Sequence, residues 1–403
     1  MLQPYKVFNS AEFTDRDAEF ERVEMFMRER NRGVLIFEGE RGSGKTTFLF
    51  ELYKRLQERY ELRPFLISLF PYSAPEFESN KNIWLNSERQ FQRNDVPDVL
   101  NRLARYLEIE TIETDDRDFQ KDYFARGLAY RASKTIPVLL VDSIYECPDE
   151  TRIDLEKYIL APLLASERVF IILSGRGKRP IWSRPELRDP EIVELPPLQK
   201  DFVIEQLDKL KKQKKTKRDP VEYDAIADLS DGYPLIVRVL AESEEKSLTD
   251  ALDKAIDIII KDALPEPEQE DKKYLQTRPL IEKLALVDIP FRIPDVEEYL
   301  YGDDKERRAK TNDLIALLLA SHLLRYEGKG YHLNQSIVKP IRRWLASKRQ
   351  GAEYREQLQK ISAKLQEEYP FAKAWYQRML PQETSLPGNI VSAYNTGKAH
   401  YAS

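Results

Sequence analysis

Residues 39–46 read Gly-Glu-Arg-Gly-Ser-Gly-Lys-Thr and fit the phosphate-loop pattern G-x-x-x-x-G-K-[ST] without a mismatch. An apolar run at residues 34–37 comes before this loop, and a segment of helical composition begins at Thr47. A strand that ends in a glycine-rich loop and continues as a helix points several backbone N–H groups at one spot, beside the positive end of the helix dipole. The context therefore predicts a phosphate-binding site rather than a chance match.

The residues of this loop have separate expected roles. Glycine at positions 39, 42 and 44 lets the backbone adopt positive φ angles and approach an anion closely. Lys45 would reach the β- and γ-phosphates of a nucleotide, and the hydroxyl of Thr46 would bind Mg²⁺. The residues that we expect to bind the nucleotide here are Gly39, Gly42, Ser43, Gly44, Lys45, Thr46 and Thr47.

A second apolar run, residues 136–141, ends in the carboxylate of Asp142. A buried strand of this form delivers an acid to Mg²⁺ beside the phosphate loop in phosphoryl-transfer sites. The pattern is weak by itself, because many buried strands end in Asp, and the loop upstream gives it its weight. We therefore expect Asp142 and Thr46 to share the metal.

A third apolar run, residues 169–173, is followed by Ser174, Gly175 and Arg176. A polar residue and a guanidinium at a strand end near a triphosphate can report whether the γ-phosphate is present. The alternative is that Arg176 pairs with a surface carboxylate. Strands that alternate with helices in this way predict an α/β fold, in which helices flank a parallel sheet and the ligand lies outside the carboxyl ends of the strands.

The composition limits the class of protein. The 403 residues have room for two or three domains, and the single cysteine, Cys147, excludes an intramolecular disulfide. The three histidines have no cysteine or histidine neighbours at ligand spacing, which argues against zinc. The net charge is −5, so any contact with nucleic acid must come from a local patch. No apolar run is long enough to span a bilayer and the first residues do not begin a signal peptide, so we expect a soluble, cytoplasmic protein without a membrane partner.

The second half of the chain is predicted to be helical. Helical spacing covers residues 201–213, 222–229, 234–243 and 249–262. The basic run at residues 209–218 either meets nucleic acid or an acidic partner, or is a solvated helix end with its loop. At Gly232-Tyr233-Pro234-Leu235 a glycine ends one helix and a proline starts the next, which helix geometry alone explains.

Three further helical patterns and a hairpin signal over Leu324–Leu333 predict a winged helix near the end of the chain. An acidic segment with two prolines precedes them and is typical of a linker. The expected domains are a phosphate-loop domain at 1–198, a helical lid at 199–262, a linker at 263–271, a winged helix at 272–347, C-terminal helices at 348–380 and a tail at 381–403.

The order of these parts resembles a known family. Residues 13–20, Phe-Thr-Asp-Arg-Asp-Ala-Glu-Phe, resemble the F-x-G-R-x-x-E-L lead-in of STAND and related AAA+ ATPases. The phosphate loop, Asp142, the strand end at Arg176, a motif at 232–235 similar to G-x-P-L, and a winged helix follow. This order resembles the NB-ARC/NACHT class of STAND signalling ATPases over about residues 10–347.

The resemblance implies ATP or ADP as the ligand, together with Mg²⁺. It places Arg16 of the lead-in among the nucleotide-binding residues, Pro234 near the adenine or ribose, and Arg176 as the residue that senses phosphate. It also implies a winged helix that closes over bound ADP.

Three positions depart from the pattern of the family. Asp15 replaces the usual glycine of the lead-in, and Asn334 stands where NB-ARC winged helices often carry a histidine facing ADP. Ser143 stands where the family commonly has Asp or Glu to polarise the attacking water. We therefore expect slow turnover unless Glu146 substitutes for that acid.

The main hypothesis is a slow, Mg²⁺-dependent ATPase that acts as a conformational switch. ADP would hold the lid and winged helix closed, and ATP would open them for self-assembly or for contact with a separate effector or sensor protein. The expected catalytic residues are Lys45, Asp142, Glu146 and Arg176.

The alternative is a DNA-binding AAA+ ATPase that resembles origin-recognition initiators, which share the lead-in and the winged helix. The basic run at 209–218 supports it, as do Lys339, Arg342, Arg343 and Lys348 after the hairpin. The expected recognition helix, Asn312–Leu324, has no Lys or Arg and counts against it. A third possibility is an interaction scaffold that binds nucleotide without turnover, which Ser143 supports.

Overall fold

The structure is a computed structural model of the chain. It describes residues 10–70, 77, 80–86, 91–110, 114, 116–131, 135–176, 180–263, 277–282, 284–285, 305–327 and 330–347. The chain divides into two compact units, Met1–Leu198 and Gln199–Ser403. No helix within the described ranges has both the length and the apolar character that crossing a membrane requires.

The first unit is built on a six-stranded sheet in which every neighbouring pair of strands is parallel. The strands in spatial order are β3 (Ile83–Leu85), β2 (Leu62–Ser68), β4 (Ile136–Asp142), β5 (Val169–Gly175), β1 (Arg32–Glu38) and β6 (Glu191–Glu194). Because all strands run in one direction, their carboxyl ends meet at one edge, where β5 separates β1 from β4. This architecture confirms the predicted α/β class.

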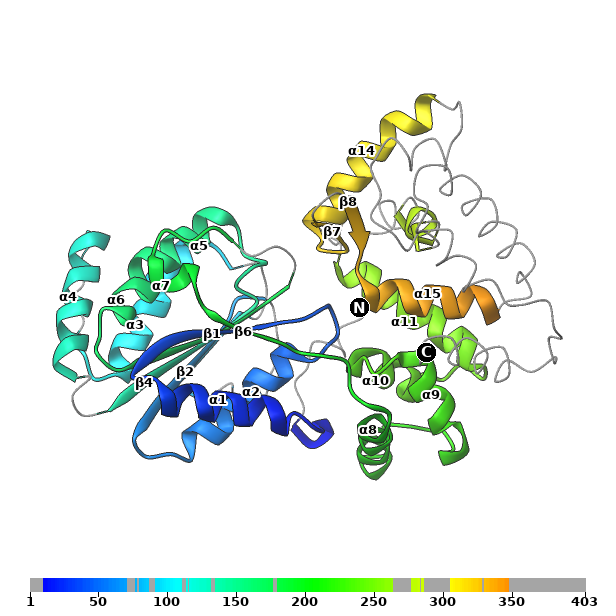
Figure 1. Ribbon diagram of the computed structural model, residues 1–403, viewed down its shortest axis with the longest axis horizontal. Coiled ribbons are helices and arrows are strands. Elements are labelled where there is room, and N and C mark those ends of the chain that lie inside the picture. Colours follow the sequence, from blue (N-terminus) through cyan, green and yellow to red (C-terminus); the bar gives the residue numbers. More distant parts are fainter. Residues whose placement is uncertain are drawn as a thin grey trace. The chain divides into compact units, whose positions relative to one another are not determined.

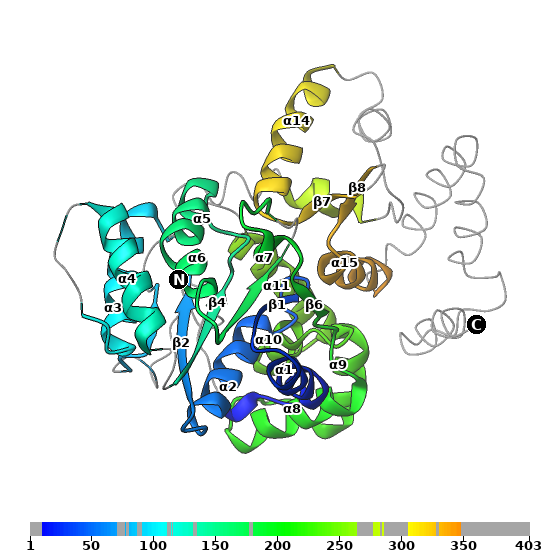
Figure 2. The same ribbon diagram turned by 60° about the vertical axis from the view of Figure 1, so that its left-hand side comes forward.

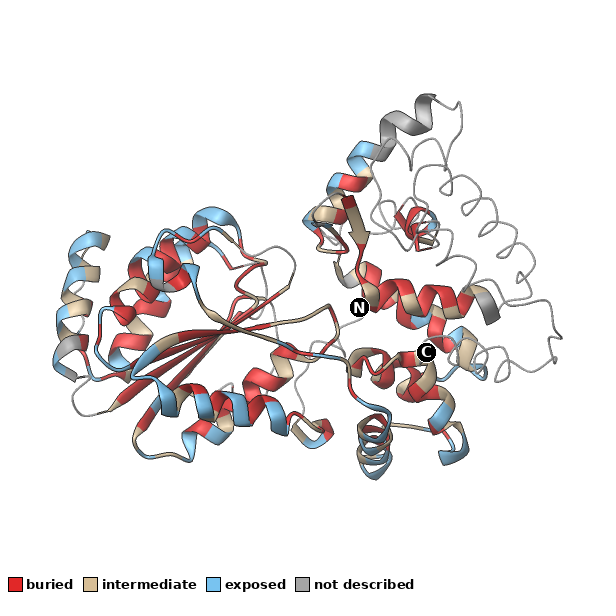
Figure 3. Ribbon diagram, viewed as in Figure 1, coloured by how far each residue is buried: buried red, intermediate tan, exposed pale blue. Residues whose placement is uncertain are grey.

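Helices cover both faces of the sheet (Figure 1). On one face, α1 (Asp17–Glu29) and α2 (Lys45–Gln57) share a core with Leu35 and Phe37 of β1. Val34 and Ile36 of the same strand face the other core. That core is closed by α3 (Val96–Tyr106), α4 (Arg117–Arg131), α5 (Asp149–Leu155), the π-helix η5 (Glu156–Leu160), α6 (Ala161–Leu164) and α7 (Pro185–Arg188). The central strands are therefore buried on both sides, as continuous apolar runs require (Figure 3).

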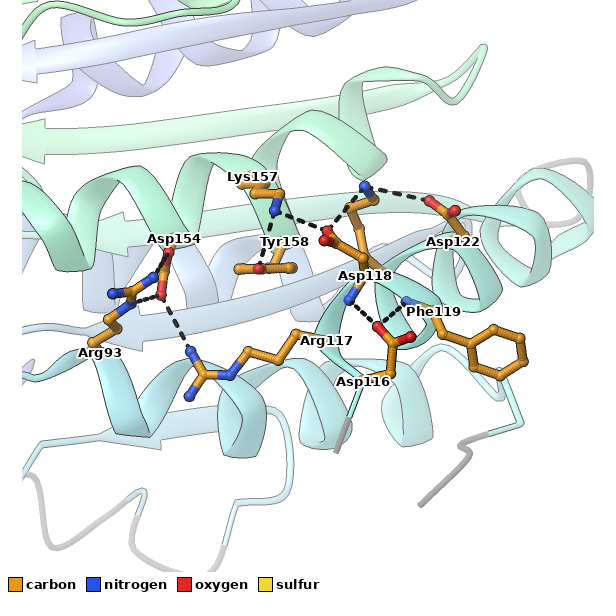
Figure 4. A network of polar contacts seen from close by, with 10 residues as sticks. Arg93, Asp116, Arg117, Asp118, Phe119, Asp122, Asp154, Lys157 and Tyr158 are labelled. Carbon is orange, nitrogen blue, oxygen red and sulfur yellow. Dashed lines mark hydrogen bonds and ion pairs between the residues drawn. The ribbon is translucent and has the colours of Figure 1, made fainter. Parts of the chain in front are cut away.

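A polar network ties the outer helix α4 to the helices beside it (Figure 4). Asp154, whose side chain is 4% exposed, accepts hydrogen bonds from Arg93, in the short helix η4 (Arg93–Asp95), and from Arg117 at the start of α4. Lys157 of η5 pairs with Asp118 of α4 at 2.8 Å. The buried carboxylate of Asp154 is thus paired with two arginines.

Two local features of this unit have no signal in the sequence. Ile83–Leu85 forms the edge strand β3 beside Leu66 of β2. Three residues are too few to show periodicity in a polar segment. The second feature is the start of α1, which begins at Asp17 with Arg16 as its N-cap and no side-chain cap. The reason is that Asp15 and Arg16 both take left-handed backbone angles.

The second unit begins with four helices close to the predicted ranges. They are α8 (Lys200–Lys212), α9 (Tyr223–Ser230, preceded by the turn η6, Pro220–Glu222), α10 (Pro234–Glu242) and α11 (Leu248–Ala263). The turn between α9 and α10 needs Asp231 at φ 51° and Gly232 at φ 76°. Pro234 then takes the first position of α10, where its missing N–H is tolerated.

The hairpin signal is confirmed later in this unit (Figure 2). β7 (Leu324–Glu327) and β8 (Gly330–Leu333) pair antiparallel, and they lie between α14 (Lys305–Ala320) and α15 (Gln335–Ser347). α14 starts seven residues before the expected recognition helix. Several expected parts lie outside the described residues. They are the second of the three further helical patterns, at residues 296–300, the linker residues 264–271, Lys348, and the predicted C-terminal helices and tail.

Two groups of charged residues hold α15 against the four helices of the second unit. Asp231 accepts from Lys339 at 2.5 Å and from Arg343 at 2.7 Å. Arg278 pairs with Asp253 of α11 at 2.8 Å, and its guanidinium lies over the ring of Trp344 in α15. Both groups join residues far apart in the chain.

Candidate nucleotide-binding site

The phosphate loop occupies the bend between β1 and α2. Gly42 has φ 80° and Gly44 has φ 92°, and Gly44 is the N-cap of α2 with no side-chain cap. Both angles are costly for residues with a Cβ, so these glycines are needed for the turn. A Cβ on Gly39 would lie 2.8 Å from Ser43 Oγ and 3.1 Å from the Leu195 carbonyl oxygen. The loop is therefore closely packed around a bare helix N-terminus, a geometry that suits an anion.

Lys45 is held by the loop itself. Its Nζ donates to the carbonyl oxygens of Gly39 at 2.6 Å and Glu40 at 2.8 Å, and to Ser43 Oγ at 3.4 Å. Burial lowers the pKa of Lys45 to about 8; Glu146 raises it and Arg176 lowers it further. The ammonium of Lys45 thus lies in a poorly solvated position and has three neutral acceptors. An anionic phosphate oxygen can replace these acceptors and form a stronger, charge-assisted hydrogen bond.

Asp142 is the centre of the polar contacts at this edge of the sheet. Its Oδ2 accepts from Thr46 Oγ1 at 2.9 Å, and its Oδ1 accepts from Ser174 Oγ at 2.6 Å. Ser174 is the second-last residue of β5, and its Oγ also accepts from the Ser143 N–H at 3.2 Å. Burial raises the pKa of the Asp142 carboxyl, and the hydrogen bonds from Ser174 and Thr46 oppose the rise. The structure thus brings together the two residues that were expected to share a metal.

The donor set suits magnesium. Within the described residues there is no group of three or more His, Cys, Asp or Glu side chains that could hold a metal by itself. Thr46 and Asp142 instead offer one hydroxyl and one carboxylate at the phosphate loop. Mg²⁺ keeps several waters and commonly takes one or two carboxylates together with substrate phosphates, so this pair fits it.

Glu146 and Arg176 form an ion pair beside this group. Arg176 Nε lies 2.7 Å from Glu146 Oε1, and the two side chains are 13% and 7% exposed. The Arg176 guanidinium also faces the Phe70 ring, 5.6 Å from its centroid. Arg176 does pair with a carboxylate, as the alternative expectation held, but that carboxylate is largely buried and is the one expected to act in catalysis.

The sequence patterns did not indicate two residues at the carboxyl edge of the sheet, Tyr145 and Glu38. Tyr145 donates its hydroxyl hydrogen to Glu38 Oε1 at 2.8 Å, and its ring fills the space where a Cβ on Gly175 would lie, at 2.5 Å. The turn after β4, with Ser143 at φ 62°, is thereby held against β1 and β5. Glu38 has the signal that was used for Asp142, a carboxylate at the end of an apolar run.

Arg16 and Pro234 lie differently from the loop residues. Arg16 is 3% exposed and donates to the carbonyl oxygen of Ser43 in the loop, at 3.1 Å. The Arg16 side chain therefore lies beside the loop, and its guanidinium is hydrogen-bonded to the loop backbone. Pro234 belongs to the second unit, where its carbonyl accepts from Gln206 at 3.3 Å. Contact of either residue with a nucleotide stays a prediction.

No protein-family model matches the chain, and no curated protein sequence matches it. Many solved structures are similar to the chain, and three of them follow. A Walker-type ATPase of Pyrococcus abyssi is 15% identical, with a TM-score of 0.49 over 82% of this chain and 96% of the other. Cdc6p of Pyrobaculum aerophilum is 14% identical, with a TM-score of 0.41 over 86% and 94%. The RuvB Holliday junction branch migration motor of Thermotoga maritima is 13% identical, with a TM-score of 0.39 over 83% and 99%. The descriptions of these three structures name no NB-ARC or NACHT protein. Sequence identities and TM-scores of this size describe a distant likeness of fold.

Proposed function

We propose that the chain binds ATP and ADP with Mg²⁺, hydrolyses ATP slowly and changes conformation with the nucleotide. One observation carries the proposal: Lys45, Thr46, Asp142 and the Glu146–Arg176 pair all lie at the carboxyl edge of one parallel sheet. A helix N-terminus, a lysine and a hydroxyl–carboxylate pair are together the parts that a nucleoside triphosphate and its metal need.

Each group has a role that follows from its position. The N–H groups of the loop and Lys45 would bind the β- and γ-phosphates, and Thr46 with Asp142 would hold Mg²⁺. When bound, Mg²⁺ neutralises charge on the phosphates. In hydrolysis a water oxygen forms a bond to the γ-phosphorus, the bond to the β,γ-bridging oxygen breaks, and the water proton passes to the Glu146 carboxylate.

The Glu146–Arg176 pair explains why turnover would be slow. While Arg176 and Glu146 pair at 2.7 Å, the carboxylate is occupied by the guanidinium and the guanidinium is occupied by the carboxylate. A γ-phosphate would compete for Arg176 and leave Glu146 to accept a proton. ADP has no γ-phosphate, so it would leave the pair intact. This difference between ATP and ADP is what a nucleotide-dependent switch requires, because equal binding to two conformations shifts nothing.

Light scattering tests the proposed switch. We expect the mass to rise with a non-hydrolysable ATP analogue and Mg²⁺, and not with ADP, because self-association would follow ATP binding. Lys45→Ala should abolish this response by removing the phosphate contact. If neither nucleotide changes mass or shape, the switch is excluded. Phosphate release separates slow turnover from a scaffold that binds nucleotide and does not hydrolyse it. An effector or sensor in a separate chain would then be sought with the ATP-bound form.

A second candidate function, DNA binding of the origin-recognition initiator type, is supported by the extent of α14. This helix directly precedes the hairpin, the position of a recognition helix in a winged helix. It begins at Lys305 rather than near Asn312. The added turns contribute four basic residues, Lys305, Arg307, Arg308 and Lys310. The helix before the hairpin therefore carries basic residues that the expected range, Asn312–Leu324, does not include.

The other basic residues give this function less support than the sequence suggested. Lys339 and Arg343 bind Asp231, and Arg342, 9% exposed, donates to the Ala285 carbonyl oxygen. Within the run at 209–218, Lys209 pairs with Glu205 at 2.6 Å. In the same run, Lys217 pairs with Glu244 and Arg218 is buried. Nucleic-acid binding in this candidate would thus depend mainly on α14.

A further inference from the structure

Arg16 joins the phosphate loop to the segment by which the chain leaves the sheet. Its Nη2 donates to the carbonyl oxygens of Ser43 at 3.1 Å and Pro196 at 2.7 Å, and its Nη1 donates to Glu19 Oε1 at 3.2 Å. Pro196 lies in Leu195–Leu198, the last residues of the first unit, which we call the exit segment. We infer that Arg16 is a positioning residue that sets the phosphate cradle and couples it to the exit segment. The inference rests on the proposed nucleotide binding.

The contact with Ser43 fixes the direction of a loop N–H group. The carbonyl of Ser43 and the N–H of Gly44 belong to one trans peptide unit and point in opposite directions. By holding the Ser43 oxygen, Arg16 turns the Gly44 N–H away from itself. Gly44 is the N-cap of α2 at φ 92°, where successive N–H groups form an anion-binding concavity. Arg16 therefore acts on phosphate through the backbone of the loop.

A second, independent contact links the loop to the exit segment. The Leu195 N–H donates to the Glu38 carbonyl oxygen at 2.7 Å, directly before the loop begins. Gly39 lies so close to Leu195 that a Cβ would be 3.1 Å from the Leu195 oxygen. A shift of the loop on phosphate binding therefore moves the exit segment at two points, Leu195 and Pro196. This segment continues directly into Gln199, the first residue of the second unit.

The backbone around Arg16 is strained in order to deliver its side chain. Asp15 has φ 62° and Arg16 has φ 82°, so two successive residues without the freedom of glycine occupy the left-handed region. Such conformations persist where surrounding contacts determine them, and they cluster at functional sites. The buried guanidinium, with two carbonyl acceptors and one carboxylate, supplies those contacts. A lysine would keep the charge but lacks the planar fork that spans two carbonyls.

The test compares Arg16→Lys with Arg218→Lys. Arg218 is the matched control, because it is also buried and also bonds two carbonyl oxygens, those of Leu240 and Glu245, and one carboxylate, that of Glu222. We expect Arg16→Lys to raise the Kd for ADP and for a non-hydrolysable ATP analogue by about tenfold. This is the effect expected when the hydrogen bond from the Gly44 N–H to the charged phosphate is misaligned. In Arg218→Lys both Kd values should stay within about twofold of wild type. The melting temperature should fall in both variants.

Hydrogen exchange of the Leu195 amide gives a measurement that a general loss of stability would not mimic. ADP should slow this exchange in the wild type and in Arg218→Lys, and should not change it in Arg16→Lys at saturating ADP. Wild type that binds ADP without any effect on Leu195 overturns the coupling, even if the Arg16 variant does not fold. An unchanged Kd in Arg16→Lys overturns the positioning role. Wild type that binds no nucleotide at all overturns the proposed function and this inference together.

Discussion

Lys45 gives the site a pH dependence of known sign. Burial lowers its pKa from 10.5 to about 8. Between these values the unfolded chain binds a proton that the folded, nucleotide-free protein does not bind, so the stability contributed by this residue rises with pH by up to about 3 kcal/mol. Phosphate binding needs the charged form, so nucleotide affinity should fall as pH rises above 8. Unfolding in urea and ADP titrations between pH 7 and 10 measure the two opposite trends.

Lys45→Met is the control for this prediction, because it removes the titrating group and keeps an aliphatic chain. The variant should be more stable than wild type near pH 7, and its advantage should shrink toward pH 10. A constant difference in the free energy of unfolding across this range would show that the buried ammonium does not titrate there.

Glu146→Gln should separate nucleotide binding from turnover. The neutral amide holds Arg176 more weakly than the carboxylate at 2.7 Å does, so the guanidinium is more available to a γ-phosphate. We expect phosphate release to fall by about 10²-fold or more. The preference for an ATP analogue over ADP should rise by about tenfold, which corresponds to one charged hydrogen bond. Isothermal titration with both nucleotides measures the ratio.

Asp154→Asn is the matched control for Glu146→Gln. Asp154 is also a buried carboxylate bound by arginines in the first unit, but it lies in the network around α4 (Figure 4). This variant should lose stability without a change in nucleotide preference. Equal nucleotide preference in Glu146→Gln and wild type would mean that Arg176 does not exchange Glu146 for phosphate.

Contacts at the residue scale differ in how far the sequence predicts them. The meeting of Thr46 and Asp142 was predictable, because the loop and the strand end are local patterns and parallel strands bring their ends to one edge. The bonds from Arg16 to Ser43 and from Tyr145 to Glu38 join positions far apart in the chain. The bond from Tyr145 to Glu38 also depends on the strand order, with β5 between β1 and β4, which no local pattern contains.

At the scale of elements, Gly39, which directly follows β1, offers a test of the loop's close packing. Gly39→Ala would place a Cβ 2.8 Å from Ser43 Oγ and 3.1 Å from the Leu195 oxygen, so the loop must move. We expect a loss of about 1–3 kcal/mol in the free energy of unfolding, the usual cost of overpacking, together with loss of ADP binding. Thermal unfolding and fluorescence titration with a labelled ADP measure the two effects.

Gly33→Ala at the opposite end of β1 controls for steric strain alone. Its Cβ would lie 2.8 Å from the Phe26 ring, far along the strand from the loop. This variant should lose stability and keep its affinity for ADP. If Gly39→Ala binds ADP as wild type does, the loop tolerates the movement and its packing on Leu195 is not required for binding.

Elements were predictable where their periodicity was long. The four helices from α8 to α11 follow apolar spacing over eight or more residues, and their bounds lie within one or two residues of the predicted ranges. The strand β3 was missed because three residues carry no period. The start of α14 was missed because Lys305, Arg307, Arg308 and Lys310 are good helix formers that add no apolar stripe.

At the scale of the whole molecule, charge limits what the chain can do with nucleic acid. The net charge of −5 gives no general attraction to a polyanion, so binding must depend on a local group of cations. Two basic groups are the candidates for such a contact. One is the first part of α14, and the other is the exposed set Lys211, Lys212 and Lys214 in and after α8. Variants that remove equal charge from each can distinguish them.

Duplex DNA binding, measured by anisotropy between 50 and 300 mM salt, separates the two proposed functions. For a switch we expect a Kd of about 10⁻⁶ M or weaker at physiological salt, whereas a nanomolar Kd with a steep salt slope would favour the initiator function. In either case, replacing Arg307, Arg308 and Lys310 by Ala should reduce the slope by about 3, because each phosphate contact contributes about 0.9. Replacing Lys211, Lys212 and Lys214 by Ala removes the same charge and should leave the slope unchanged. Equal losses in the two triple variants would contradict a dedicated role for α14.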